Sequence, residues 1–270
     1  LALMAVGILA SAYGFISDPT RASGTFIVNF MYWAGIAQGG LMLAVALVLT
    51  KGRWGRPLKR FAEAFGLMMV PMYILLMAFL LLGGLDVYEW SHWTEAGAPP
   101  HKWIYFQRPF FFARLGGLLG ILLVLDILFI RASVRSDMGV AKEKYGWEPS
   151  GLAAMIGGIG GWKGEKSEVE ASQKSQNRLA PILAIAYAVV WSVMAVDVSM
   201  SLMPYWYTNM FPAWYFMSCI WSGFVYLAIF TLLFRKTLGI EKAFPPSLYH
   251  DLGKLTFGFT MFWGYTTFAQ

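Results

Sequence analysis

Residues 109–131 read PFFFARLGGLLGILLVLDILFIR, and this stretch decides the fold class. Between its proline and its final arginine, the only charged side chains are Arg114 and Asp126. A helix needs about 20 predominantly apolar residues to cross a bilayer, and this stretch has that length. No ten-residue stretch alternates apolar and polar side chains as the strands of a membrane β-barrel do. Six further segments share its character: 1–16, 25–49, 65–85, 179–201, 212–234 and 253–270. The sequence therefore predicts an all-α integral membrane protein, a helical bundle of about seven spans.

The composition excludes several classes of protein. Of the 270 residues, 58% are hydrophobic and 13% are charged, whereas a soluble domain carries about 25% charged residues. An ordinary soluble enzyme, a disordered chain and a nucleic-acid-binding domain are therefore excluded. The single Cys219 permits no CxxC site, and His92, His101 and His250 lie in or beside polar segments. Because a transmembrane haem takes axial ligands inside the bilayer, the sequence predicts no haem, iron–sulfur cluster or metal in this chain.

The positive charges are concentrated in alternate loops. The segments 51–60, 131–178 and 235–254 hold 17 of the 21 lysines and arginines. By the positive-inside rule, these segments are predicted to be cytoplasmic. The chain then divides into four spans in residues 1–131, a Gly-rich charged cytoplasmic loop in 132–178, and three spans in 179–270. Because both ends of the sequence fall within apolar runs, we expect further helices beyond position 270.

Charged side chains at membrane depth are the first functional candidates, because each costs about 2.5–3.5 kcal/mol to insert at a helix centre. Arg114 could snorkel to the interface, bind a carboxylate or quinone headgroup, or pair with an acid from another span. Asp126, about one turn from the predicted cytoplasmic end of its span, is either an interfacial acid near Arg131 or the start of a cytoplasmic proton path. The two lie twelve positions apart on one helix, about 18 Å along its axis, so they cannot pair directly.

Asp197 is the strongest of the three charged candidates. Ser201 follows one helical turn later, so its hydroxyl is predicted to bond the Asp197 carboxylate. Beyond Pro204 comes an aromatic patch that starts at Tyr205. This group could bind or protonate a quinone or form the outer part of a proton channel, and the alternative is an interfacial aromatic belt beside a helix-terminal acid. Gln38, next to two glycines, predicts close helix packing with an interhelical hydrogen bond.

Five stretches resemble one membrane-protein family and occur in its order. They are 29–40 (NFMYWAGIAQGG), 53–64 (RWGRPLKRFAEA), 101–114 (HKWIYFQRPFFFAR), 197–208 (DVSMSLMPYWYT) and 251–270 (DLGKLTFGFTMFWGYTTFAQ). Together they are similar to the ActF-type membrane subunit of alternative complex III, a quinol:electron-acceptor oxidoreductase. That subunit belongs to the wider polysulfide-reductase (NrfD-like) membrane family. The resemblance covers almost the whole chain.

The resemblance implies a fold of about ten helices, with two four-helix bundles, in the bacterial inner membrane. It implies assembly with a related quinone-binding membrane subunit, an iron–sulfur subunit and c-type cytochrome subunits, which would hold the clusters and haem c. Quinone or menaquinone is the candidate ligand. Asp197 falls at the acid of a family motif and Arg114 at its arginine after Pro-Phe-Phe. Val198 stands where the family has Trp, and Tyr205 where it has His.

The leading hypothesis is a cofactor-free integral membrane subunit of a quinol-oxidising respiratory complex, in which Asp126 and Asp197 take part in proton transfer. One alternative is a purely structural anchor that docks the redox subunits. Another is an independent secondary transporter, although neither the inverted repeat nor the midplane charge cluster of many transporters is evident in the sequence.

Overall fold

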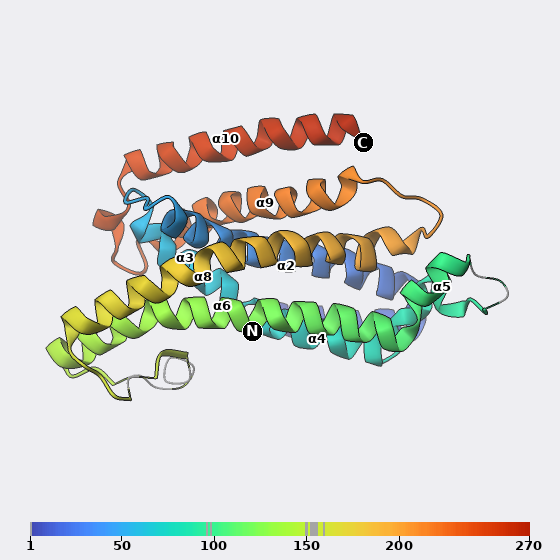
Figure 1. Cartoon of the computed structure of the whole chain (residues 1–270), viewed down its shortest axis with the longest axis horizontal. Helices are drawn as coiled ribbons and strands as arrows, with labels where there is room; N and C mark the ends of the chain where they lie inside the picture. The colour runs from blue at the N-terminus through green and yellow to red at the C-terminus, as the bar shows by residue number, and fades with distance from the viewer. Residues whose placement is uncertain (1, 96, 98, 149–150, 152–155, 159) are drawn as a thin grey trace.

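The computed structural model describes residues 2–95, 97, 99–148, 151, 156–158 and 160–270, and within them it contains helices and no strands. The long helices run along the longest axis of the molecule (Figure 1). They are α1 (Ala2–Ser17), α2 (Pro19–Leu49), α3 (Arg56–Leu67), α4 (Met69–Leu81), α6 (Arg108–Tyr145), α8 (Glu165–Met194), α9 (Met210–Phe234) and α10 (Pro246–Ala269). Shorter elements are η1 (Gly84–Val87), η2 (Glu89–His92), α5 (Pro100–Phe106), η3 (Ala195–Ser199), η4 (Met200–Leu202) and η5 (Glu241–Ala243).

The chain is an all-α, multi-pass membrane bundle. Among the described residues, five helical segments are long and apolar enough to cross a bilayer: Pro19–Leu49, Arg56–Leu81, Arg108–Tyr145, Glu165–Leu202 and Met210–Phe234. The remaining two predicted spans are also helical, but α1 has only 16 residues and α10 begins with polar residues 249–251. The structure thus supports the fold class and not the count of seven spans.

Helices extend into the segments predicted to be loops. The third predicted span starts earlier, at Arg56, and breaks at Met68. Pro71 explains the break, because its ring clashes with the carbonyl group four residues earlier and it lacks an N–H. α6 continues to Tyr145 and α8 begins at Glu165, so much of the predicted 132–178 loop is helical. Residues 149, 150, 152–155 and 159 of that loop lie outside the described part of the chain.

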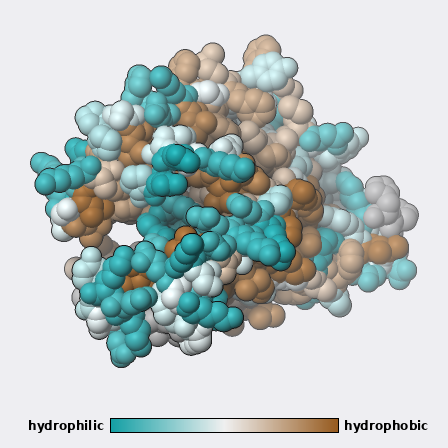
Figure 2. Space-filling view, turned by 60° about the vertical axis from the view of Figure 1, so that its left-hand side comes forward, coloured by the Kyte–Doolittle hydropathy of each residue, from teal (hydrophilic) through white to brown (hydrophobic). Residues whose placement is uncertain are grey.

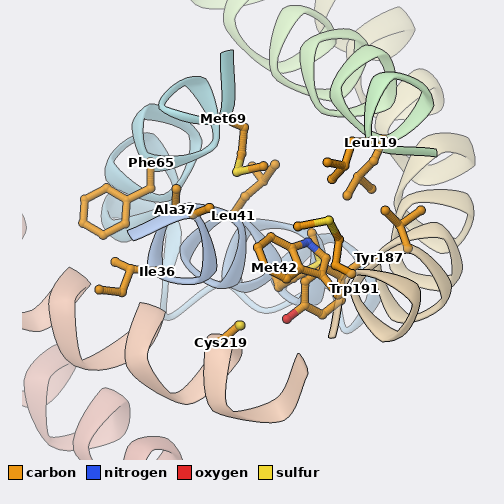
Figure 3. Close-up of a cluster of buried hydrophobic side chains, with 14 of the residues drawn as sticks. Ile36, Ala37, Leu41, Met42, Phe65, Met69, Leu119, Tyr187, Trp191 and Cys219 are labelled. Atoms are coloured by element: carbon orange, nitrogen blue, oxygen red, sulfur yellow. The ribbon is translucent and has the colours of Figure 1, made fainter. Parts of the chain in front are cut away.

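α2 is the central helix and packs against α1, α3, α4, α8 and α9. Its contact with α9 is made by small residues: a Cβ atom added at Gly39 would lie 1.8 Å from the Cys219 carbonyl oxygen. One added at Gly223 of α9 would lie 2.3 Å from the backbone nitrogen of Gly40. Figure 3 shows Cys219 of α9 facing the α2 segment that carries Ile36, Ala37 and Leu41. The close packing predicted around Gln38 is therefore confirmed.

The two ends of the bundle differ in chemistry. The α2–α3 connection, the α6–α8 connection and the α9–α10 connection gather at one end, which we call the basic end, and α5 lies at the other (Figure 1). Figure 2 brings the basic end forward and shows hydrophilic residues crowded over it. Between the ends, large apolar side chains such as Ile121, Val124, Ile185 and Val189 are exposed on α6 and α8. Exposed apolar surface of this extent is expected of helices that face lipid.

We predict that Gly39→Ala disrupts the bundle. The added methyl group meets backbone atoms of α9, so the helices must separate, at a cost of about 3 kcal/mol or more in the free energy of unfolding. Gly117→Ala on α6 is the matched control, because no atom lies within 4 Å of its added Cβ. It should be neutral or stabilising by up to about 1 kcal/mol. Thermal unfolding in detergent checks both, and equal midpoints for the two variants would contradict the packing described.

Candidate functional site

An ion pair joins two membrane-spanning helices near the α5 end. Arg114 of α6 donates from Nε to Asp197 Oδ2 at 2.8 Å and from Nη2 to Asp197 Oδ1 at 2.9 Å. Its side chain is 10% exposed, and that of Asp197 is fully buried. Two parallel N–H···O contacts of this kind are the strongest arrangement between a guanidinium and a carboxylate. The structure therefore brings together two of the residues singled out in the sequence, 83 positions apart.

Tyr105 of α5 completes this cluster. Its hydroxyl group donates to Asp197 Oδ1 at 2.8 Å, and its carbonyl oxygen accepts from Arg114 Nη1 at 3.0 Å. Its ring also covers the guanidinium, with Arg114 Cζ 3.6 Å from the ring centroid. Burial, together with the nearby Asp197 carboxylate, raises the pKa of the Tyr105 hydroxyl above its ordinary value. The hydroxyl is therefore protonated at neutral pH, as a donor to a carboxylate must be.

Local backbone geometry places these groups. Pro109 lies in the first turn of α6, where its missing N–H costs nothing, and Gln107 before the helix has an extended backbone. The chain therefore turns sharply there, and α5 folds back against α6. The partner of Arg114, Asp197, lies in η3, a single π-helical turn that follows α8. Such turns are uncommon and occur frequently at functional sites.

The prediction that Ser201 bonds the Asp197 carboxylate is wrong. Ser201 Oγ donates instead to the backbone carbonyl oxygen of Asp197, at 2.6 Å. Serine and threonine hydroxyls in helices commonly bond the carbonyl oxygen four residues earlier, as Ser192 and Ser218 also do in this chain. The next carbonyl group, that of Val198, accepts a hydrogen bond of 3.0 Å from the Tyr88 hydroxyl. Burial raises the pKa of this Tyr88 hydroxyl, so it too stays a donor.

Tyr205 does not join the cluster. Its side chain is 65% exposed. Its ring lies 5.9 Å from Lys102 Nζ and 6.3 Å from the Trp93 ring. Lys102 Nζ in turn donates to the carbonyl oxygen of Pro204. The position of Tyr205 is that of an interfacial aromatic residue beside a cation, separate from Asp197.

Asp126 forms a second buried polar site. Gln38 Nε2 of α2 donates to Asp126 Oδ1 at 2.9 Å, which confirms the predicted interhelical hydrogen bond of Gln38. Asp126 is 1% exposed, and its Oδ2 has no hydrogen-bond partner among the described residues; neither does Gln38 Oε1. α6 continues past the predicted span to Tyr145, so Asp126 lies at the middle of this helix. Unlike Asp197, this acid has no cation beside it in the described structure.

An apolar layer separates the two sites. Leu119 lies on α6 between Arg114 and Asp126, and it is 2% exposed. Figure 3 shows Leu119 near Tyr187 and Trp191 of α8, with Met42 of α2 beside them. The Tyr187 hydroxyl donates sideways, to the carbonyl oxygen of Phe216 in α9. Within the described residues, no chain of hydrogen bonds leads from Asp126 to the Arg114–Asp197 pair.

Tyr105 is the main residue of the Arg114–Asp197 cluster that the sequence did not indicate. The signal available was its place in a short segment between Pro100 and Pro109, which forces a turn just before Arg114. That spacing indicates a fold-back and does not identify which side chain meets the arginine. The rest of the cluster depends on the packing of α6 against α8.

Comparison with known proteins adds no identification. No protein-family model matches the chain. No curated protein shows significant similarity to it. Within the described residues, no group of three His, Cys, Asp or Glu side chains is placed to hold a metal ion. The two buried sites therefore carry the functional argument.

We predict strong energetic coupling between Arg114 and Asp197. Arg114→Gln or Asp197→Asn alone leaves one buried charge unpaired, which costs about 3–5 kcal/mol of folding free energy. The double variant should cost at least about 2 kcal/mol less than the sum of the two. Unfolding of the four proteins in detergent measures this coupling. Arg108→Gln is the control, because Arg108 is exposed and bonds only weakly to the Ser91 carbonyl oxygen, at 3.4 Å. Strictly additive effects would contradict the coupling.

Proposed function

We propose that this chain is an integral membrane subunit of a quinol-oxidising respiratory complex similar to alternative complex III. It contributes to the membrane arm, and its buried acids transfer protons coupled to quinol oxidation. Electrons pass through iron–sulfur clusters and c-type haems held by partner subunits, beside a related quinone-binding membrane subunit. The proposed location is the bacterial inner membrane, with the basic end in the cytoplasm, as the positive-inside rule predicts.

The observation that carries the proposal is the buried pair of Arg114 and Asp197 in two membrane-spanning segments, which Tyr105 of α5 closes from one side. Ionisable residues at membrane depth are rare and mark proton relays, ion pathways and ligand sites. Asp126, also buried within a membrane-spanning helix, has a carboxylate oxygen without a hydrogen-bond partner among the described residues. Two acids at different depths on adjacent helices provide groups that can hold and release a proton.

The geometry favours proton transfer over quinone binding at Arg114. Its Nε, Nη1 and Nη2 atoms all donate to Asp197 or Tyr105. The carboxylate of Asp197 accepts three hydrogen bonds from these same two side chains. A quinone headgroup would have to displace one of these contacts before it could bind. We therefore propose that the partner subunit binds the quinone and that this cluster takes part in proton transfer.

A structural anchor is the second candidate function. The same ion pair links α6 to α8, and Tyr105 fastens α5 to both. A cluster that satisfies its own hydrogen bonds can fix helices in place without any part in proton transfer. Enzyme turnover separates the two functions, because an anchor tolerates loss of the acids as long as the complex assembles.

We predict that Asp126→Asn and Asp197→Asn each reduce proton release coupled to quinol oxidation by roughly tenfold or more, since lost proton transfer typically costs 10²–10⁴-fold. The assay uses the purified complex in proteoliposomes, with quinol turnover and the pH change followed together. Asp126→Asn keeps an oxygen that can accept from Gln38, so its fold should be intact. Asp251→Asn, an exposed acid of α10, is the matched control and should have no effect.

Assembly decides how an activity loss is interpreted. Each variant must co-purify with the iron–sulfur and cytochrome subunits in wild-type amounts. Full turnover and proton release in an Arg114, Asp126 and Asp197 triple variant that assembles would favour the anchor. Purification of the wild-type chain as a lone monomer that takes up a substrate would overturn membership of a respiratory complex.

A further inference from the structure

A cavity of about 750 Å³ lies at the basic end, away from both buried sites. Its walls come from the end of α2, the α2–α3 connection, α6 and α8. The volume falls within the range of about 300–1,000 Å³ typical of small-molecule sites. The fold thus forms a hollow between helices that are widely separated in the sequence.

The cavity lining is strongly basic. It includes five cationic residues and one acid: Lys51, Arg53, Arg56, Lys59, Arg60 and Asp137. Arg60 is ion-paired with both Asp137 and the buried Glu63, and Lys59 Nζ lies 3.8 Å from Glu63 Oε1. The two available acids are therefore already engaged by Lys59 and Arg60.

Three cations remain without a counter-charge. Lys51, Arg53 and Arg56 form no ion pair with any residue that the structure describes. Like charges around one hollow repel, and an anion placed between them removes that cost. Neutral hydrogen-bonding groups, Ser136, Ser172, Gln173 and Asn177, line the same cavity. A compact anion with several acceptor oxygens fits this lining.

Lys51 is held at this cavity in an unfavourable backbone conformation. Its φ of 53° makes it the one residue other than glycine with positive φ among the described positions. Glycine is the usual residue after a helix C-terminus in this conformation, because it has no Cβ. A lysine here weakens the helix end, and what it adds is a charge at the cavity.

The depth of the cavity indicates where the anion comes from. Leu47 and Val48, at the end of the α2 span, form an apolar part of the wall. Trp54 of the α2–α3 connection is partly exposed nearby, as aromatic residues at membrane interfaces are. Phospholipid headgroups lie at this level, just beyond the hydrocarbon core. Basic pockets between helices on the cytoplasmic side are known to take anionic headgroups.

We propose that this cavity binds the phosphate headgroup of an anionic phospholipid, with Lys51, Arg53 and Arg56 as its principal ligands. The binding chemistry is that of a phosphate group, and the cavity's place at the end of the spans assigns it to lipid rather than to free phosphate. The site is independent of Asp126 and Asp197, so it stands whether or not the proposed proton role is correct.

The test uses the full protein in its native assembly, purified in a neutral detergent and depleted of lipid. Phosphatidylglycerol should bind saturably and raise the thermal unfolding midpoint, and native mass spectrometry should show it retained. Arg53→Gln/Arg56→Gln should raise the half-saturating concentration about 30-fold, from roughly fivefold per basic residue. Lys51→Gly should raise it about fivefold while leaving the protein no less stable without lipid.

Lys236→Gln/Lys242→Gln is the matched control. It removes two positive charges from the α9–α10 connection at the same end, outside the cavity lining. At physiological ionic strength it should change binding by about twofold or less. An equal loss in this control would overturn the site in favour of a general basic surface. An equal midpoint shift with phosphatidylcholine would show that charge is not recognised. A full shift with inorganic phosphate alone would overturn the lipid assignment.

Discussion

The contact between the backbones of α2 and α9 fixes the positions of the other helices. Helices in lipid associate by close packing and hydrogen bonds, because lipid chains are as apolar as the side chains that they replace. Gly39 and Gly223 allow this approach. With α9 so close on one side, the rest of α2 is enclosed by α3, α4 and α8. Within its buried run from Ala34 to Val45, Gln38 is the only polar side chain. Its amide must find a partner, and it finds Asp126 of α6.

Asp126 and Asp197 are stabilised in different ways, and this difference bears on their roles. The Asp197 carboxylate has a guanidinium and a phenol as donors, and all its hydrogen bonds come from Arg114 and Tyr105. Asp126 has a single neutral donor. The contacts of Asp197 stabilise a charged carboxylate. Protonation of Asp197 breaks the ion pair that joins α6 to η3, the π-helical turn after α8. Protonation of Asp126 breaks no ion pair, because its donor Gln38 is neutral. Under the proposed proton role, transfer at Asp197 would be coupled to helix packing, and transfer at Asp126 would not.

Much of the fold could be predicted from the sequence, because apolar length and loop charge are local properties. The helical segments and the hydrogen-bonding role of Gln38 follow from such patterns, as does the concentration of charge at one end. Features that depend on packing could not be predicted. Arg114 had several candidate partners until α6 was placed against α8. The spacing of Ser201 and Asp197 does not reveal that the hydroxyl bonds the backbone carbonyl group of Asp197 rather than its carboxylate. The basic cavity gathers residues 47–60, 133–137 and 169–177, and no single stretch of sequence displays it.

Access to the Arg114–Asp197 pair depends on α5. This helix has only seven residues, and Tyr105 supplies both a donor to Asp197 and an acceptor to Arg114. Displacement of α5 therefore removes two hydrogen bonds and the covering ring in one step, and opens the pair toward the α5 end. In the other direction, the buried side chains of Leu119 and Trp191 lie along α6 and α8 between this pair and Asp126. Under the proposed proton role, a proton would reach Asp197 from the α5 side in this conformation, and transfer between Asp197 and Asp126 would require the apolar layer to rearrange.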